Sequence, residues 1–189
     1  KTINPNFKLT DADVEKFNQQ GFLLLKQIYS QELIDYYIDA IQSELQEPTD
    51  KYQSGFNRVR YDIFAEDRSI YDMIADPIFR DTMKRLTQRE MIFTQALAFE
   101  MKKSSSKGFP WHIGTQSFGF QRAEDFGLTI WFPLVPIDPK GQRGGMAYVP
   151  TNRVSGDFMY NRIDPSTFNF LREKIANNED LFIDEYMLL

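Results

Sequence analysis

The only histidine of the chain, His112, is the side chain best suited to bind a metal or to transfer a proton near neutral pH. It follows Trp111 directly and stands two residues before Gly114. Taken alone, His112 is either a hydrogen-bonded structural imidazole or a functional group on a loop between strands. The local sequence favours a plain role for Gly114, as a loop residue that needs a positive φ.

The composition excludes several kinds of site and partner. The 189 residues contain no cysteine, which excludes disulfides, thiolate metal sites and thiol nucleophiles. A single histidine excludes a cluster of imidazoles. The 22 Lys and Arg against 27 Asp and Glu give a net charge of −5, which argues against a nucleic-acid partner. No apolar run is long enough to cross a membrane and no secretory leader opens the chain, so the expected compartment is the cytoplasm.

Helices must position these residues from the N-terminal side. Thr10 is a predicted N-cap with Asp13 in the capping-box position, and Gly21 closes the same helix. Ser30 caps a second helix with one apolar face, and Pro77 is a good first-turn residue for a later one. The pattern predicts helices over 11–19, from 31 to just before Pro48, over 67–86 as two short pieces, and over 164–177.

Strand-like segments dominate the middle of the chain. Apolar alternation and β-branched or aromatic residues predict strands over 22–26, 57–64, 91–101, 128–135 and 146–149. Pro133 places the fourth of these at an edge or a bulge. Helices followed by strands indicate an α+β fold. We expect one domain, with 1–90 as mainly helical support, 91–150 as core strands and 151–189 as an insertion or lid region.

Four stretches, in order along the chain, resemble the phytanoyl-CoA dioxygenase superfamily. They are Phe17–Leu25 before an amphipathic helix, Trp111-His112 after a strand and loop, Leu128–Leu134 with Trp131 at its centre, and Gly145–Pro150 with a Gly-x-x-x-Val-Pro pattern. The resemblance covers essentially the whole chain. It implies a double-stranded β-helix, a jelly-roll or cupin-like fold, that holds Fe(II) and 2-oxoglutarate.

The resemblance also implies roles for individual residues. Enzymes of this family bind iron with a His-x-Asp/Glu pair and a distal histidine, which makes His112 the first metal ligand. Gln95 and Trp131 match positions that line the cosubstrate pocket, although a surface glutamine and a core tryptophan are the plain alternatives. Gly114 occupies the carboxylate position. In the halogenases of this superfamily a small residue there lets chloride bind iron, because both volume and negative charge are missing.

Two further features of the family have no match in the chain. No histidine follows His112, and no position matches the arginine that grips the far carboxylate of 2-oxoglutarate. The strand-like section is also too short to close a barrel. We therefore expect the domain to be incomplete at its C-terminal side, with that histidine and arginine downstream. The other interpretation is a degenerate protein that binds no metal.

The resemblance thus predicts a Fe(II)- and 2-oxoglutarate-dependent radical halogenase that uses O2 to chlorinate an unactivated aliphatic carbon. The sequence most resembles the halogenases embedded in polyketide synthases, which act on a substrate tethered to an acyl carrier protein. The basic cluster Lys102, Lys103 and Lys107 could meet such an acidic carrier, or could be a solvated loop. The alternatives are a hydroxylase of the same superfamily and a non-catalytic binding module on that scaffold.

Overall fold

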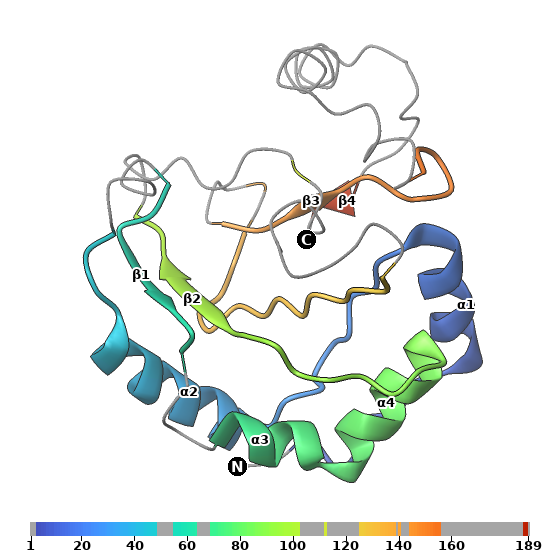
Figure 1. The fold of residues 1–189 in the computed structure, drawn as a ribbon, viewed down its shortest axis with the longest axis horizontal. Coiled ribbons are helices and arrows are strands. Elements are labelled where there is room, and N and C mark those ends of the chain that lie inside the picture. Colours follow the sequence, from blue (N-terminus) through green and yellow to red (C-terminus); the bar gives the residue numbers. More distant parts are fainter. Residues whose placement is uncertain are drawn as a thin grey trace.

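Within the residues that the structure describes, four helices and four short strands follow one another along the chain (Figure 1). The computed structural model describes residues 3–48, 55–63, 69–102, 112, 125–138, 140, 144–155 and 187–188. The helices are α1 (Asp11–Gln20), α2 (Gln31–Glu44), α3 (Ser69–Ala75) and α4 (Pro77–Thr87), and the strands are β1 (Arg58–Tyr61), β2 (Leu97–Glu100), β3 (Ala147–Tyr148) and β4 (Met187–Leu188).

Local capping chemistry sets the helix ends where the sequence predicts them. The Thr10 hydroxyl accepts the Asp13 amide at 3.1 Å, and the Asp13 carboxylate accepts the Thr10 amide at 2.9 Å, which completes the capping box. The Thr10 hydroxyl also donates to Asp13 Oδ2 at 2.7 Å, and this bond, followed by that from the Thr10 amide, holds the pKa of Asp13 below its usual value. At the other end Gly21 adopts φ +78° and donates its amide to the Phe17 carbonyl. Ser30 caps α2 as predicted.

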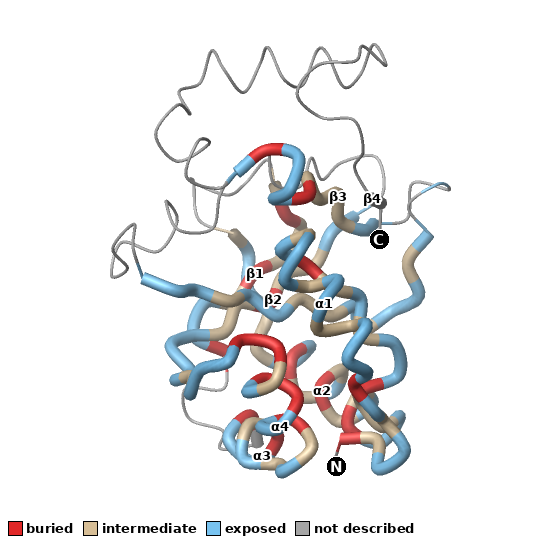
Figure 2. The backbone as a smooth tube through the Cα atoms, turned by 90° about the vertical axis from the view of Figure 1, so that its right-hand side faces the viewer, coloured by how far each residue is buried: buried red, intermediate tan, exposed pale blue. Residues whose placement is uncertain are grey.

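The hydrophobic core is built largely from the buried faces of α2 and α4. α2 buries Leu33, Tyr37 and Ile41, and the helix is amphipathic because these positions repeat at helical spacing. α4 begins with Pro77 in its first turn, as the sequence predicts, and the structure shows that Asp76 caps it. Figure 2 marks these buried stretches in red on α2 and α4. The helices form the lower and right-hand border of the molecule in Figure 1.

Two small antiparallel sheets stand apart from each other in the sequence. β1 pairs with β2, with Arg58 opposite Glu100 and Tyr61 opposite Leu97. β3 pairs with β4, with Tyr148 opposite Met187. Each sheet has two strands within the described residues. The double-stranded β-helix therefore stays a prediction, and the predicted helix over 164–177 lies outside the described residues.

Some predicted strands take a different form. The prediction was wrong for 22–26 and 128–135, which join no ladder, and too long for 91–101, where only Leu97–Glu100 pairs. The apolar residues of these segments are used for packing instead. Phe22 is buried and stacks on Tyr148, while the Phe132 ring lies 4.9 Å from that of Tyr29. Because apolar runs occur in buried irregular chain as well as in strands, the pattern alone does not separate the two.

Candidate functional site

Of the sequence motif that carries the proposed metal ligand, only His112 is among the described residues. His112 is exposed to solvent. Gly114, the position predicted to admit a halide, lies outside the described residues, and so does Trp111. The structure therefore gives the imidazole a solvent-accessible place. That Gly114 leaves a coordination position open to a halide stays a prediction.

The two residues predicted to line the cosubstrate pocket come from different environments. Gln95 is exposed and stands two residues before β2 begins. Trp131 is half-buried. Its neighbour Phe132 holds the segment on the core, because the Phe132 ring packs against Tyr29 at 4.9 Å and against Tyr37 at 6.0 Å between centroids. The backbone at Trp131 is thus anchored.

No cluster that could hold a metal ion exists in the part of the chain that the structure describes, since no three His, Asp or Glu side chains gather there. Fe(II) in enzymes of this type needs two imidazoles besides its exchangeable ligands. The chain has one histidine. The single imidazole of these residues therefore does not by itself make an iron site.

The carboxylate of Glu100, at the end of β2, accepts hydrogen bonds from Arg58 and Asn57. Its Oε2 accepts Arg58 Nη2 at 2.6 Å, and its Oε1 accepts the Asn57 side-chain amide. The Arg58 hydrogen bond, followed by that from Asn57, holds the pKa of Glu100 below its usual value of 4.5. Both oxygens are used, so this carboxylate fastens β1 to β2.

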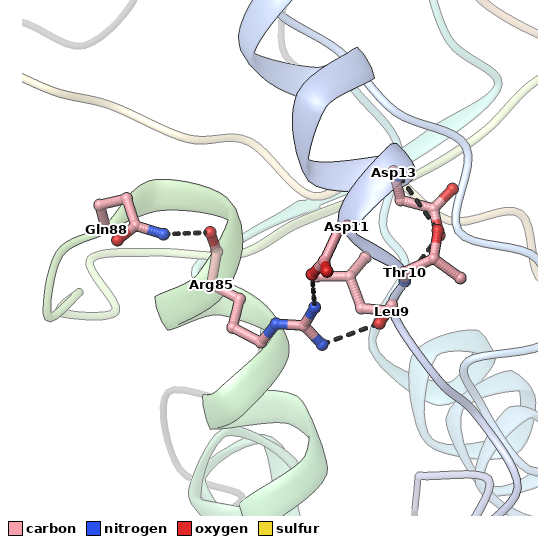
Figure 3. A network of polar contacts seen from close by, with 6 residues as sticks. All are labelled: Leu9, Thr10, Asp11, Asp13, Arg85 and Gln88. Carbon is pink, nitrogen blue, oxygen red and sulfur yellow. Dashed lines mark hydrogen bonds and ion pairs between the residues drawn. The ribbon is translucent and has the colours of Figure 1, made fainter.

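A cleft of about 380 Å³ opens between the N-terminal segment and α4. Its lining includes the charged side chains Lys8, Asp81 and Arg85. Arg85 donates from Nη1 to the Leu9 carbonyl and from Nη2 to Asp11, each at 2.8 Å (Figure 3). The guanidinium thus ties α4 to the residues that enter α1. Arg85 is paired with Asp11, and Lys8 and Asp81 have opposite charges, so the lining favours neither an anion nor a cation.

Sequence reasoning gave no sign of this arginine contact. The partners of Arg85 are 76 and 74 positions away in the chain. An arginine on an amphipathic helix is ordinarily a solvated residue. No protein-family model, curated protein or solved structure matches the chain. The resemblance to the phytanoyl-CoA dioxygenase superfamily therefore depends on the motifs in the sequence alone.

Proposed function

We propose that the chain is part of a Fe(II)- and 2-oxoglutarate-dependent halogenase. The observation that carries this proposal is the motif His112-Ile113-Gly114, which puts a residue without a side chain where the related hydroxylases have a carboxylate. An anionic side chain and a halide compete for one coordination position, so the loss of the first makes room for the second. The exposed position of His112 supports access to solvent and ligands.

The proposal assigns a role to each candidate residue. His112 is one iron ligand, Gly114 leaves the halide position open, and Gln95 with Trp131 lines the 2-oxoglutarate pocket. When bound, iron with 2-oxoglutarate and O2 would supply the removal of a hydrogen atom from an unactivated carbon and the transfer of chlorine to it. The second histidine and the arginine for 2-oxoglutarate would have to come from residues other than these 189.

The proposed substrate is an acyl group tethered to a carrier protein, and the proposed compartment is the cytoplasm. Within the helices described, none combines the length and the apolar character needed to cross a bilayer. Neither nucleic acid nor membrane is a proposed partner, because the net charge of −5 would repel both phosphate backbones and anionic lipids.

The test is a product assay on the protein as its gene encodes it, with Fe(II), 2-oxoglutarate, O2, chloride and acyl-carrier-bound substrates. We expect chlorinated product, recognised in the mass spectrum by the chlorine isotope pattern. The variant Gly114→Asp should lose chlorination, because a carboxylate then occupies the halide position. Gly114→Ala should retain it in part, since alanine has no ligand atom. Hydroxylated product alone at saturating chloride would favour the hydroxylase, and chlorination kept by Gly114→Asp would refute the proposal.

The single imidazole favours a second candidate, a non-catalytic binding module on the same scaffold. This candidate needs no metal at all. It predicts that the protein takes up no Fe(II) under anaerobic conditions, with or without 2-oxoglutarate. The halogenase proposal predicts uptake that Fe(II) titration detects and that His112→Ala removes.

A further inference from the structure

The C-terminus of α1 holds a segment that lies about 130 residues later in the chain. The Thr151 amide donates to the Gln20 carbonyl at 2.9 Å. The Thr151 hydroxyl donates to the Gln19 carbonyl at 3.4 Å, across 132 positions of the chain. These carbonyls belong to the last turn of α1, where helix carbonyls have no partner inside the helix. Thr151 thus satisfies groups that would otherwise need water.

An aromatic stack joins the same two segments. The rings of Phe22 and Tyr148 stack with their centroids 5.0 Å apart and their planes 13° from parallel. Phe22 follows the cap of α1 and is buried, and Val154, just after the turn at Thr151, is buried as well. Burial also raises the pKa of Tyr148. Aromatic pairs of this kind contribute beyond the area they bury.

The backbone at Gly21 fits this contact because it carries no side chain. Its φ is +78°, and a Cβ built there would lie 2.5 Å from Thr151 Cγ2. Gly144 also has a positive φ, +76°, but a Cβ there would meet only Ile137 Cγ2, at an ordinary 3.6 Å. Of these two glycines, only Gly21 lies in close approach to Thr151.

We propose that residues 19–22 and 148–154 form a clamp, a conformational device that makes the end of α1 and the exit from β3 open and close as one unit. β3 also pairs with β4 through Tyr148 and Met187. The clamp therefore gathers chain positions near 20, 150 and 187 at one place. This inference goes beyond the proposed function, since it involves no metal, cosubstrate or substrate.

The inference is tested by amide hydrogen exchange in the full chain. The reporters are the Thr151 amide on one side and the Gly21 amide, which donates to the Phe17 carbonyl at 2.8 Å, on the other. Tyr148→Ala removes the stacked ring, and we expect both amides to exchange about tenfold faster, because local opening sets the exchange of protected amides. Tyr148→Phe keeps the ring and should leave both rates within about twofold of wild type.

A second variant controls for general loosening. Tyr71→Ala removes a half-exposed ring from α3, where Tyr71 makes an edge contact with Phe93. It should leave the Gly21 and Thr151 amides unchanged. Faster exchange at Thr151 alone in Tyr148→Ala would overturn the clamp, because the two segments would then open independently. Equal acceleration by Tyr71→Ala would overturn it too.

Discussion

Substituting Gly21 by alanine should destabilise the protein far more than the same change at Gly144. Both glycines have a positive φ, so each alanine variant carries the cost of a left-handed backbone, about 1 kcal/mol. Only at position 21 does the new methyl group also collide with a neighbour. The colliding atoms are Thr151 Cγ2 at 2.5 Å and Oγ1 at 3.0 Å, with Thr151 Cβ at 3.3 Å.

The magnitude follows from how this collision can be relieved. Rotation of the Thr151 side chain does not remove it, because Cγ2 and Oγ1 both lie close to the new methyl group and a turn about the Cα–Cβ bond leaves at least one heavy atom there. The segment must move away instead, which lengthens the hydrogen bond from the Thr151 amide to Gln20. Overpacking of this kind typically costs about 1–3 kcal/mol. We therefore expect a loss of about 2–4 kcal/mol in unfolding free energy for Gly21→Ala, against about 1 kcal/mol for Gly144→Ala.

The assay is urea unfolding followed by circular dichroism, with the slope compared between variants to confirm that the transition is unchanged in character. The double variant Gly21→Ala with Thr151→Ala should recover most of the excess loss, since it removes both Cγ2 and Oγ1. Thr151→Ala alone should have little effect, because its exposed hydroxyl makes one long hydrogen bond. Equal losses at the two glycines, or strictly additive effects in the double variant, would refute the reasoning.

Two further variants test the polar contacts. Glu100→Gln should weaken the acid dependence of stability. Because bonds from Arg58 lower the pKa of Glu100 in the folded protein, the stability that this carboxylate contributes is present above about pH 4.5 and is lost as pH falls through the folded pKa. The difference in unfolding free energy between wild type and variant should therefore shrink with acidification. A gap that is constant with pH would contradict this. Arg85→Ala should lower the unfolding free energy by about 1 kcal/mol in urea, because it removes the hydrogen bond to the Leu9 carbonyl. Asp11→Asn should cost nothing measurable, because that carboxylate is fully exposed. Equal losses would show that the ion pair is the stabilising part.

The helix ends could be predicted because their causes are local. Thr10 with Asp13, Gly21 and Pro77 each act within one turn of chain, and the structure confirms all of them. Capping geometry needs no knowledge of distant residues. The strand positions depend on distant partners. The apolar run from Phe22 predicts a strand, but the segment pairs with no strand and the Phe22 ring stacks on Tyr148.

The long-range contacts could not be predicted from one sequence. Nothing in the local pattern at Thr151 or Arg85 indicates that each one bonds a carbonyl near α1, more than 70 residues away. For the candidate site, the sequence supplies His112 and Gly114 as a pair, and the described structure adds only that His112 is exposed. The pairing of the two residues at a metal stays a prediction because it depends on ligands from elsewhere.

X-ray absorption at the iron edge tests the central claim most directly. The sample is the anaerobic protein with Fe(II), 2-oxoglutarate and bromide, a halide that scatters strongly. The account predicts an iron–bromine shell in the wild type and its absence in Gly114→Asp. A spectrum from metal-loaded wild-type protein with only nitrogen and oxygen neighbours around the iron would contradict it.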